Sequence, residues 1–330
     1  MKNKVLETIK KYNLIENGDK LVLGVSGGPD SISMLNILNE IRKDDKVKLN
    51  YEIVVVHINH MIRKEAVDDE LYVKEYCDKR NIDFYSKSID VKKLANTNKI
   101  GTEEAGRNVR YKFFNEILEK TSSNKIAIAH NKNDNAETMI MNIMRGSGIS
   151  GLKGIEPKRG IYIRPLIECE REEIEKYCEK NKLNPRIDKT NFENEYTRNK
   201  IRNIVIPYVK KEFNPNLINT LKRLSDLVKE EEVYIEKQVL GIYNNIVIEQ
   251  KENEIILDLK KFNVQEKVIK SRLILYTITR ILGTSQGMEK IHIEDIIKLC
   301  SNNIGNKYLT PNKKLKILVK NHKIYFLSQI

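Results

Sequence analysis

The sequence predicts an α/β protein: a doubly wound, mainly parallel five-stranded sheet, then a helical linker and a small C-terminal α+β domain. Two observations lead to this fold. Short apolar segments alternate with segments of helical periodicity over the first half of the chain, a pattern typical of βαβ units with helices on both faces of a sheet. Beyond about residue 196 the alternation stops, and a long amphipathic helix follows.

The predicted elements can be assigned in chain order. After an amphipathic N-terminal helix, the strands are 20–26, 51–58, 84–89, 125–130 and 161–167, and the helices are 30–41, 64–80, 103–120, 134–145 and 170–182. A helix over 217–240 precedes a strand at 254–259, helices over about 266–282 and 289–300, and a β-rich tail. We therefore expect three regions, at 1–206, 207–240 and 241–330.

Composition narrows the class of protein. The chain has 330 residues, of which 40% are hydrophobic and 32% charged, values that permit a buried core under a well-solvated surface. No stretch approaches the roughly 18 to 20 apolar residues of a membrane span, and the N-terminal segment lacks the apolar region of a signal peptide. The four cysteines form no C-x-x-C pair, which favours free thiols. We expect a cytoplasmic protein.

The charge balance favours a polyanionic partner. The formal net charge is +13, although Lys, Asn and Ile are abundant throughout and a compositional bias could produce the same excess. The distribution of charge is more informative. Residues 198–223 carry seven Lys or Arg and the single acid Glu212, and residues 306–323 carry six Lys and no acid. These two segments are candidates for contacts with a nucleic acid backbone.

A glycine-rich turn lies between the first predicted strand of the sheet and the helix that follows it. Two glycines let the backbone approach a phosphate, and a helix N-terminus favours an anion. Serine hydroxyls can add donors, and Asp30 is placed to hold Mg²⁺ against the phosphates. The Walker A spacing with its lysine is absent, and an ordinary Gly-Pro turn is the alternative. The predicted nucleotide site comprises Ser26, Gly27, Gly28, Pro29, Asp30 and Ser31.

This turn resembles the SGGxDS signature of the PP-loop ATP pyrophosphatases, whose members leave the α-phosphate open to attack. The resemblance implies an adenine nucleotide alpha hydrolase-like fold. Further segments resemble, in the same order, those of the tRNA(Ile)-lysidine synthetases. They are 57–63 (HINHMIR), 102–111 (TEEAGRNVRY), 129–138 (AHNKNDNAET), 144–155 (MRGSGISGLKGI), 164–166 (RPL) and 186–203.

The chain departs from the family pattern in several places. Thr102 replaces a Leu, and Gly106 replaces an Ala, in the element that is LEAxARxxRY in the family. In the element AHHxDDQAET, three asparagines replace a His, an Asp and a Gln: Asn131, Asn133 and Asn135. No role is assigned to Asn133.

Candidate catalytic residues follow from these motifs. Arg107 and Arg110 are i, i+3 on a predicted helix and share a face, so they can stabilise charge on an α-phosphate; two solvated arginines are the alternative. Asp134 and Glu137 project from one face of a first helical turn, suited to Mg²⁺ or an ammonium group. Asp134 can equally be the N-cap of a structural capping pair. The resemblance places His57 beside the nucleotide.

Three further arginines are candidates for contacts with lysine or tRNA, together with Asp134 and Glu137. They are Arg145, Arg198 and Arg202, all in segments that resemble the family. The four glycines after Arg145 predict a shaped loop that approaches a ligand or the nucleic acid.

The resemblance implies a two-step reaction with ATP and Mg²⁺. The wobble cytidine in the CAU anticodon of an isoleucine tRNA would be adenylated with release of pyrophosphate. Free lysine would then displace AMP from carbon 2 to form lysidine, changing codon reading from AUG to AUA. Two alternatives are a two-thiocytidine thiolase, disfavoured because paired cysteines are missing, and a non-catalytic basic tRNA-binding protein. The sequence leaves open a homodimer, and whether the chain is a short family form or a truncated one.

Overall fold

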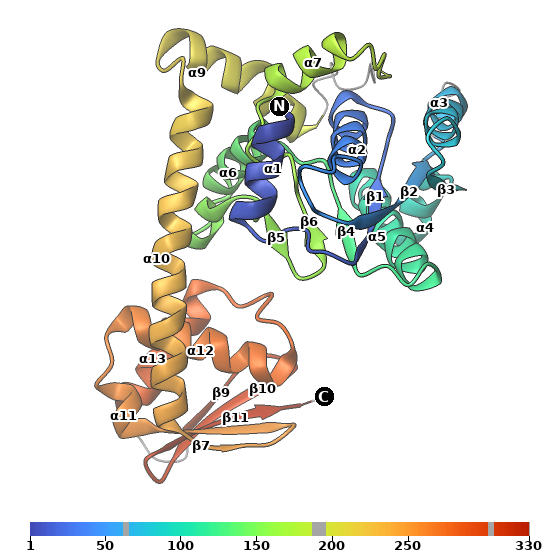
Figure 1. Ribbon diagram of the computed structural model, residues 1–330. Helices are drawn as coiled ribbons and strands as arrows, with labels where there is room; N and C mark the ends of the chain where they lie inside the picture. Colours follow the sequence, from blue (N-terminus) through green and yellow to red (C-terminus); the bar gives the residue numbers. More distant parts are fainter. Residues whose placement is uncertain (62–65, 187–195, 303–306, 330) are drawn as a thin grey trace. The chain divides into compact units, whose positions relative to one another are not determined.

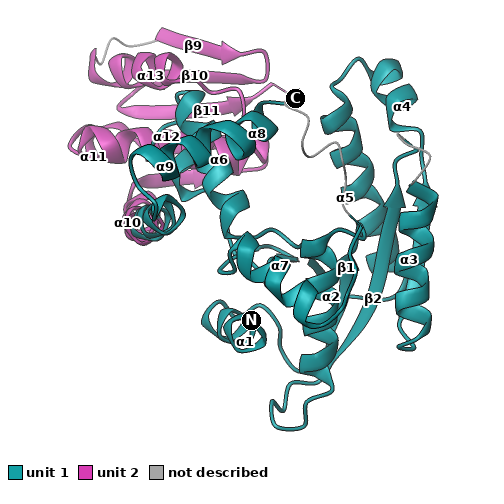
Figure 2. Ribbon diagram, turned by 90° about the horizontal axis from the view of Figure 1, so that it is seen from above, with its two compact units in different colours: residues 1–228 teal, residues 229–330 magenta. Residues whose placement is uncertain are grey.

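The computed structural model describes residues 1–61, 66–186, 196–302 and 307–329 of the chain. The chain divides into two compact units, residues 1–228 and 229–330 (Figure 2). The division falls inside a single long helix, α10 (Leu217–Ile246), which is the helix predicted over 217–240 extended to Ile246.

The first unit contains a six-stranded sheet in the order β3-β2-β1-β4-β6-β5 (Figure 1). The first five of these strands are parallel to one another, as predicted, and β5 is an added short antiparallel edge strand. The segment predicted as a strand over 161–167 pairs only through its first residues. The strands are β1 (Asp19–Gly24), β2 (Tyr51–Asn59), β3 (Asp83–Ser88), β4 (Lys125–Ala127), β5 (Lys158–Arg159) and β6 (Tyr162–Ile163).

Helices cover both faces of this sheet (Figure 1). All the predicted helices of this unit are present, and α4 is an additional one. They are α1 (Lys2–Lys11), α2 (Pro29–Arg42), α3 (Ala66–Asp78), α4 (Val91–Asn98), α5 (Thr102–Lys120), α6 (Lys132–Met144) and α7 (Arg171–Lys180). A short 3-10 turn (Ile149–Lys153) follows α6. A last helical stretch consists of α8 (Thr197–Lys200), a π turn (Ile201–Val205) and α9 (Ile206–Glu212).

Alternate residues of the central strands enter two different cores. Leu21 and Leu23 of β1 pack with buried residues of α1, α2, α3 and α7. Val22, between them, packs on the other face with Phe113 and Phe114 of α5. Because both faces are covered, the strands read as continuous apolar runs rather than as alternating ones.

The second unit is an antiparallel sheet packed against helices. Its strand order is β7-β8-β11-β10-β9. One core joins the C-terminal half of α10 to the three helices and the sheet, and Phe262 and Phe326 are fully buried in it. The elements are β7 (Val247–Gln250), β8 (Glu254–Asp258), α11 (Leu259–Asn263), α12 (Lys267–Leu282), α13 (Lys290–Asn302), β9 (Lys307–Asn312), β10 (Leu315–Lys320) and β11 (Lys323–Ser328).

The strand order of the first unit places a topological switch point beside β1. The chain passes from β1 to β2 and β3 on one side and returns to β4 on the other side. Ligands of open α/β sheets bind at the carboxyl ends of strands next to such a point. The polar segments that the sequence singles out follow β1, β2 and β4, so they meet at this edge.

The four cysteines are free and buried, as expected. Within the described part of the chain, no helix is long and apolar enough to cross a membrane.

Candidate active site

A cleft of about 870 Å³ opens at the carboxyl ends of β1, β2 and β4. Its walls include the glycine-rich turn after β1, the end of β2 and the residues after β4. Four arginines also line it: Arg110, Arg171 and Arg202 from three different helical segments, and Arg186 from the chain after α7. The cleft therefore combines backbone donors with guanidinium groups, both of which bind phosphates.

The glycine-rich turn is held in a defined conformation. Gly27 has φ +90°, a backbone conformation that side chains disfavour. The Ser31 hydroxyl accepts a hydrogen bond from the Ser26 N–H (3.1 Å) and donates one to the Gly28 carbonyl (3.0 Å). Gly28 is the N-cap of α2, with Pro29 in the first turn, and no described side chain caps the helix. The N-terminus of α2 can therefore donate to an anion in the cleft.

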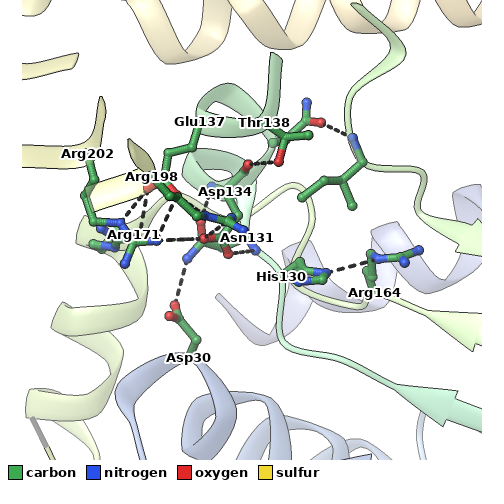
Figure 3. Close-up of polar contacts among 12 residues, drawn as sticks. Asp30, His130, Asn131, Asp134, Glu137, Thr138, Arg164, Arg171, Arg198 and Arg202 are labelled. Carbon is green, nitrogen blue, oxygen red and sulfur yellow. Dashed lines mark hydrogen bonds and ion pairs between the residues drawn. The ribbon is translucent and has the colours of Figure 1, made fainter. Parts of the chain in front are cut away.

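Asp30 is linked to the next motif through Asn131. The Asn131 side-chain amide donates to Asp30 Oδ1 at 2.8 Å (Figure 3). Asn131 is fully buried and is the N-cap of α6; its Oδ1 accepts from the Asp134 N–H, and Asp134 Oδ2 accepts from the Asn131 N–H. The alternative in which Asp134 is itself the N-cap is therefore wrong, although Asp134 does take part in the capping box. The helix begins earlier, at Lys132, which puts Asp134 at the third helical position.

Asp134 and Glu137 form a compact cluster with arginines (Figure 3). Glu137 is buried and contacts Arg198 Nε at 2.8 Å and Arg202 Nε at 2.6 Å. Asp134 Oδ1 contacts the same two arginines at 3.1 and 3.0 Å. Arg171, at the start of α7, lies 3.6 Å from Glu137 and 3.9 Å from Asp134. The structure thus brings together four of the five candidates for contacts with lysine or tRNA: Asp134, Glu137, Arg198 and Arg202.

The electrostatics keep the cluster ionised. Burial raises the pKa of Asp134, but Arg198, His130 and Arg202 outweigh it and lower the pKa below its ordinary value. Burial lowers the pKa of Arg198, and the two carboxylates more than reverse this. Three guanidinium groups face two carboxylates, a net charge of +1. Since Arg171 and Arg202 line the cleft and the two carboxylates do not, the arginines present this cluster to a ligand.

The pKa of Asp30 shifts in the opposite direction to that of Asp134. Burial and the nearby Asp134 raise its pKa to about 6, even though the Asn131 amide favours the ionised form. A cation next to Asp30 would favour its ionised form. Among the described residues, no group of three or more His, Cys, Asp or Glu could hold a metal ion. Asp30 can still contribute one ligand to Mg²⁺, because this ion commonly binds through one carboxylate, phosphate oxygens and water.

The other predicted arginines lie elsewhere. Arg110 of α5 lines the cleft, whereas Arg107 does not, and its guanidinium lies over the Tyr111 ring at 5.3 Å. Arg145 is exposed at the C-terminus of α6 and is likewise outside the lining of the cleft. The structure therefore brings one of the two α5 arginines to the site.

Two histidines at the end of β2 line the cleft. His57 Nδ1 lies 2.9 Å from the Val25 carbonyl, so this nitrogen carries the proton, and burial lowers the pKa of the ring. His60 Nδ1 is buried and has no hydrogen-bond partner among the described residues. Burial, then Arg110 and His57, lower the pKa of His60 to about 4. Both rings are neutral at physiological pH. Arg63 and the segment 187–195, which the sequence also singled out, lie outside the described residues.

Sequence reasoning did not assign roles to Asn131, Arg171 or His60. Asn131 precedes a helix and is a typical N-cap residue, but its bond to Asp30 joins residues 101 positions apart. Arg171 belongs to no motif, and only the packing of α7 brings it to the cluster. No local signal could have identified these contacts.

A doubly wound sheet with a glycine-rich turn at its switch point is common to several classes of nucleotide-binding protein. The class here is the PP-loop class, because the PP-loop domain family matches residues 1–209. Among solved structures, the U34-tRNA thiolase NcsA from Methanococcus maripaludis, with its [4Fe-4S] cluster, is similar over 68% of this chain and 78% of that one. The TM-score is 0.54 at 20% sequence identity. This likeness concerns the fold alone.

Curated relatives identify the family. The tRNA(Ile)-lysidine synthase of Clostridioides difficile (strain 630) is 44% identical over 329 residues, covering 99% of this chain and 70% of that protein. The enzyme of the same name from Clostridium acetobutylicum is 46% identical, covering 94% and 67%. The one from Geobacillus kaustophilus is 31% identical, covering 96% and 68%. The chain belongs to the tRNA(Ile)-lysidine synthase family and spans about two thirds of the length of these relatives.

The family and the enzyme class that it carries, an ATP-dependent ligase with a PP-loop domain, are as the sequence predicted. The relatives' names do not support the alternative of a thiolase.

Proposed function

We propose that the protein uses ATP to adenylate the wobble cytidine of an isoleucine tRNA with a CAU anticodon and then joins carbon 2 of that base to free lysine. One observation carries the proposal. The uncapped N-terminus of α2 lines a cleft whose wall also holds Arg171 and Arg202, two members of a cluster of three arginines and two buried carboxylates. The first feature suits a triphosphate, and the second suits a zwitterionic amino acid with a carboxylate and two ammonium groups.

In the first step, the 2-keto oxygen of the cytidine attacks the α-phosphorus, and the bond from that phosphorus to the pyrophosphate oxygen breaks. The turn from Ser26 to Ser31 holds the pyrophosphate through its N–H and hydroxyl groups. Arg110 in the cleft wall stabilises negative charge as it develops. Bound Mg²⁺ would neutralise phosphate charge, with Asp30, phosphate oxygens and water as its ligands.

In the second step, the lysine ε-amine attacks carbon 2 and the bond from carbon 2 to the AMP oxygen breaks. The amine must lose a proton, and Asp134 and Glu137 are the nearest buried carboxylates to the arginines of the cleft. Both are paired with arginines, so an ammonium group must replace a guanidinium group. We infer that Arg171 or Arg202 turns to the ATP phosphates or to the lysine carboxylate, which frees a carboxylate oxygen for the amine.

Two basic segments are the proposed contacts with the tRNA backbone. Residues 198–223 lie in the first unit, and the lysine-rich strands over 306–323 lie in the second. Neither segment carries more than one acid, which favours binding through counterion release.

The deciding experiment follows labelled lysine and pyrophosphate with unmodified CAU tRNA. Pyrophosphate should appear with ATP and this tRNA in the absence of lysine, and AMP release with lysine incorporation should require all three. A non-catalytic tRNA-binding protein would release no pyrophosphate. Incorporation of sulfur, or pyrophosphate release without tRNA, would contradict the proposal.

Asp30→Ala should abolish adenylation. The substitution removes the carboxylate at the phosphate turn and leaves the Asn131 amide without its partner, so pyrophosphate release should fall by at least about 10³-fold. The measurement is tRNA-dependent pyrophosphate release. The exposed Asp45→Ala, in the same unit, is the matched control and should behave as wild type. Unchanged turnover in Asp30→Ala would remove Asp30 from the mechanism.

Glu137→Gln should separate the two steps. A neutral side chain of the same shape cannot accept the amine proton, so lysine transfer should fall by about 10²-fold or more. Pyrophosphate release in the absence of lysine should change much less. Because the substitution leaves buried guanidinium groups short of one charge partner, thermal unfolding must first show that the variant is folded. Equal losses in both steps would place Glu137 in adenylation instead.

A further inference from the structure

The first unit exposes a pair of aromatic rings far along its last helical stretch. Tyr208 lies on α9 and Phe213 directly follows it, and their side chains are 59% and 73% exposed. The ring centroids are 5.9 Å apart at an angle of 63°. Ile204, one turn before Tyr208, is 52% exposed. We call Tyr208 and Phe213 the aromatic platform. Exposed apolar side chains that lie together, rather than scattered singly, often mark an interaction site.

The platform is carried by the same helical stretch that supplies Arg198 and Arg202 of the arginine cluster. Ile201 and Ile206 of this stretch are buried with Ala136 of α6 and Ile218 of α10. Arg202, between them, reaches the carboxylates of α6. Tyr208 follows six residues later, about 9 Å along a helical rise. The packing that positions Arg202 therefore also positions the platform, at a distance that a few nucleotides of a single strand can span.

The charge around the platform is positive. Lys200, Lys210 and Lys211 flank it in sequence, and the one acid of segment 198–223, Glu212, is paired with Lys211 at 3.1 Å. These three lysines and the two glutamates that pair with them, Glu212 and Glu172, carry a net charge of +1. Lys210 lies 3.6 Å from Glu172 of α7. A second copy of this chain would bring equal positive charge to the same place, and a neutral apolar protein surface would gain nothing from the lysines. Single-stranded RNA has an anionic backbone and planar bases, so it matches both the lysines and the aromatic rings.

We propose that the aromatic platform stacks an unpaired nucleobase of the RNA substrate, while the flanking lysines neutralise its phosphates. The platform thereby positions the single-stranded loop so that the target base enters the cleft. This rests on the proposed function for the identity of the RNA, but not for the stacking itself. Aromatic side chains bind bases without sequence preference, because every base has a π-face.

Fluorescence offers a direct test, because the chain contains no Trp. Phe213→Trp introduces a single indole into the platform, and stacking of a base should quench it. The probes are the anticodon stem-loop of a CAU tRNA and a fully paired RNA duplex of equal length, both measured at the same salt concentration. Quenching by the stem-loop and not by the duplex supports the proposal. Ile161→Trp, at an exposed position in the β5–β6 hairpin, is the control and should respond to neither probe. Equal quenching by both probes, or none, overturns the proposal.

A second test measures the affinity of the protein for the stem-loop. Tyr208→Leu and Phe213→Leu keep apolar bulk and remove the ring, and each should weaken binding of the stem-loop about tenfold. Tyr208→Phe and Phe213→Tyr keep the ring and should bind as wild type. Equal binding by the leucine variants overturns the platform. If wild type incorporates lysine while the leucine variants bind normally, only the platform is wrong. If the indole is quenched but no lysine is incorporated, only the proposed function is wrong.

Discussion

Positive charge in the cleft comes from groups that do not titrate near neutral pH. Besides His57 and His60, His130 is also neutral: burial, then Arg164 and Arg198, lower its pKa to about 4 against the opposing effect of Asp134. Arg164 Nε donates to His130 Nδ1 at 3.2 Å, which is possible only when that nitrogen is unprotonated. The cleft therefore presents to a ligand arginines whose charge is constant, and imidazoles that act only as neutral hydrogen-bonding groups.

The pH dependence of stability should report the buried His60. Its pKa in the folded protein, about 4, lies below its ordinary value of 6.5. Between these values the unfolded chain binds a proton that the native protein does not, so stability falls as the pH drops from 6.5 towards 4. The slope of the free energy of unfolding against pH should therefore be smaller in His60→Gln, by at most about 1.4 kcal/mol per pH unit. Urea unfolding between pH 7 and about 4.5 is the measurement, and the exposed His322→Gln is the control. Identical slopes in His60→Gln and wild type would mean that His60 titrates alike in both states.

At the level of elements, α6 organises the site. Its N-cap, Asn131, reaches Asp30, and its first turns place Asp134 and Glu137 in the arginine cluster. Its other side carries Asn135, whose side-chain oxygen accepts the Ile155 N–H at 2.5 Å. The glycine-rich loop after α6 is therefore shaped by packing back onto the helix. The expectation that this loop approaches a ligand or the RNA remains a prediction.

Gly154→Ala should destabilise the first unit more than Gly146→Ala. Both glycines have positive φ, +61° and +70°, so each alanine should cost about 1 kcal/mol or more in backbone strain. A Cβ at Gly154 would also overlap Asn135 Oδ1, whereas a Cβ at Gly146 meets nothing within 4 Å. The additional cost at Gly154 should be about 1–3 kcal/mol. Thermal or urea unfolding of the two variants measures the difference. Equal destabilisation would show that the loop accommodates the Cβ at Gly154 without further loss of stability.

At the level of the whole molecule, basic surface occurs in both compact units. In the second unit, Lys313 and Lys314 form the turn between β9 and β10, and Lys316 lies over the Tyr308 ring at 4.4 Å. The three-region division at 206 and 240 remains a proposal about function, while the contacts divide the chain within α10.

Replacing Lys313, Lys314 and Lys316 together with Gln should weaken tRNA binding and flatten its dependence on salt. Loss of three phosphate contacts would reduce the slope of log K against log salt by up to about 2.7. Binding of unmodified tRNA over a series of salt concentrations gives the slope. Replacement of the three exposed lysines Lys43, Lys46 and Lys48 in the first unit is the charge-matched control. An unchanged slope in the Lys313, Lys314 and Lys316 variant would show that these lysines do not contact the RNA.

The sequence by itself determined the main strands of the sheet, the glycine-rich turn after the first of them and the family. Strands buried on both faces appear as apolar runs, and the residues from Ser26 to Ser31 form a local strand–turn–helix geometry. Both are encoded within a few consecutive residues. The order of the motifs along the chain then identified the family without any knowledge of contacts between them.

Only the tertiary structure decided which side chains act together. Periodicity places Arg107 and Arg110 on one helix face, but the packing of α5 brings only Arg110 to the cleft. Likewise, Glu137 meets Arg198, 61 positions away, and Asp30 meets Asn131. A buried charge is stable only beside a partner that offsets its desolvation. That partner arrives from a distant element, so its identity depends on how the elements pack and not on local spacing.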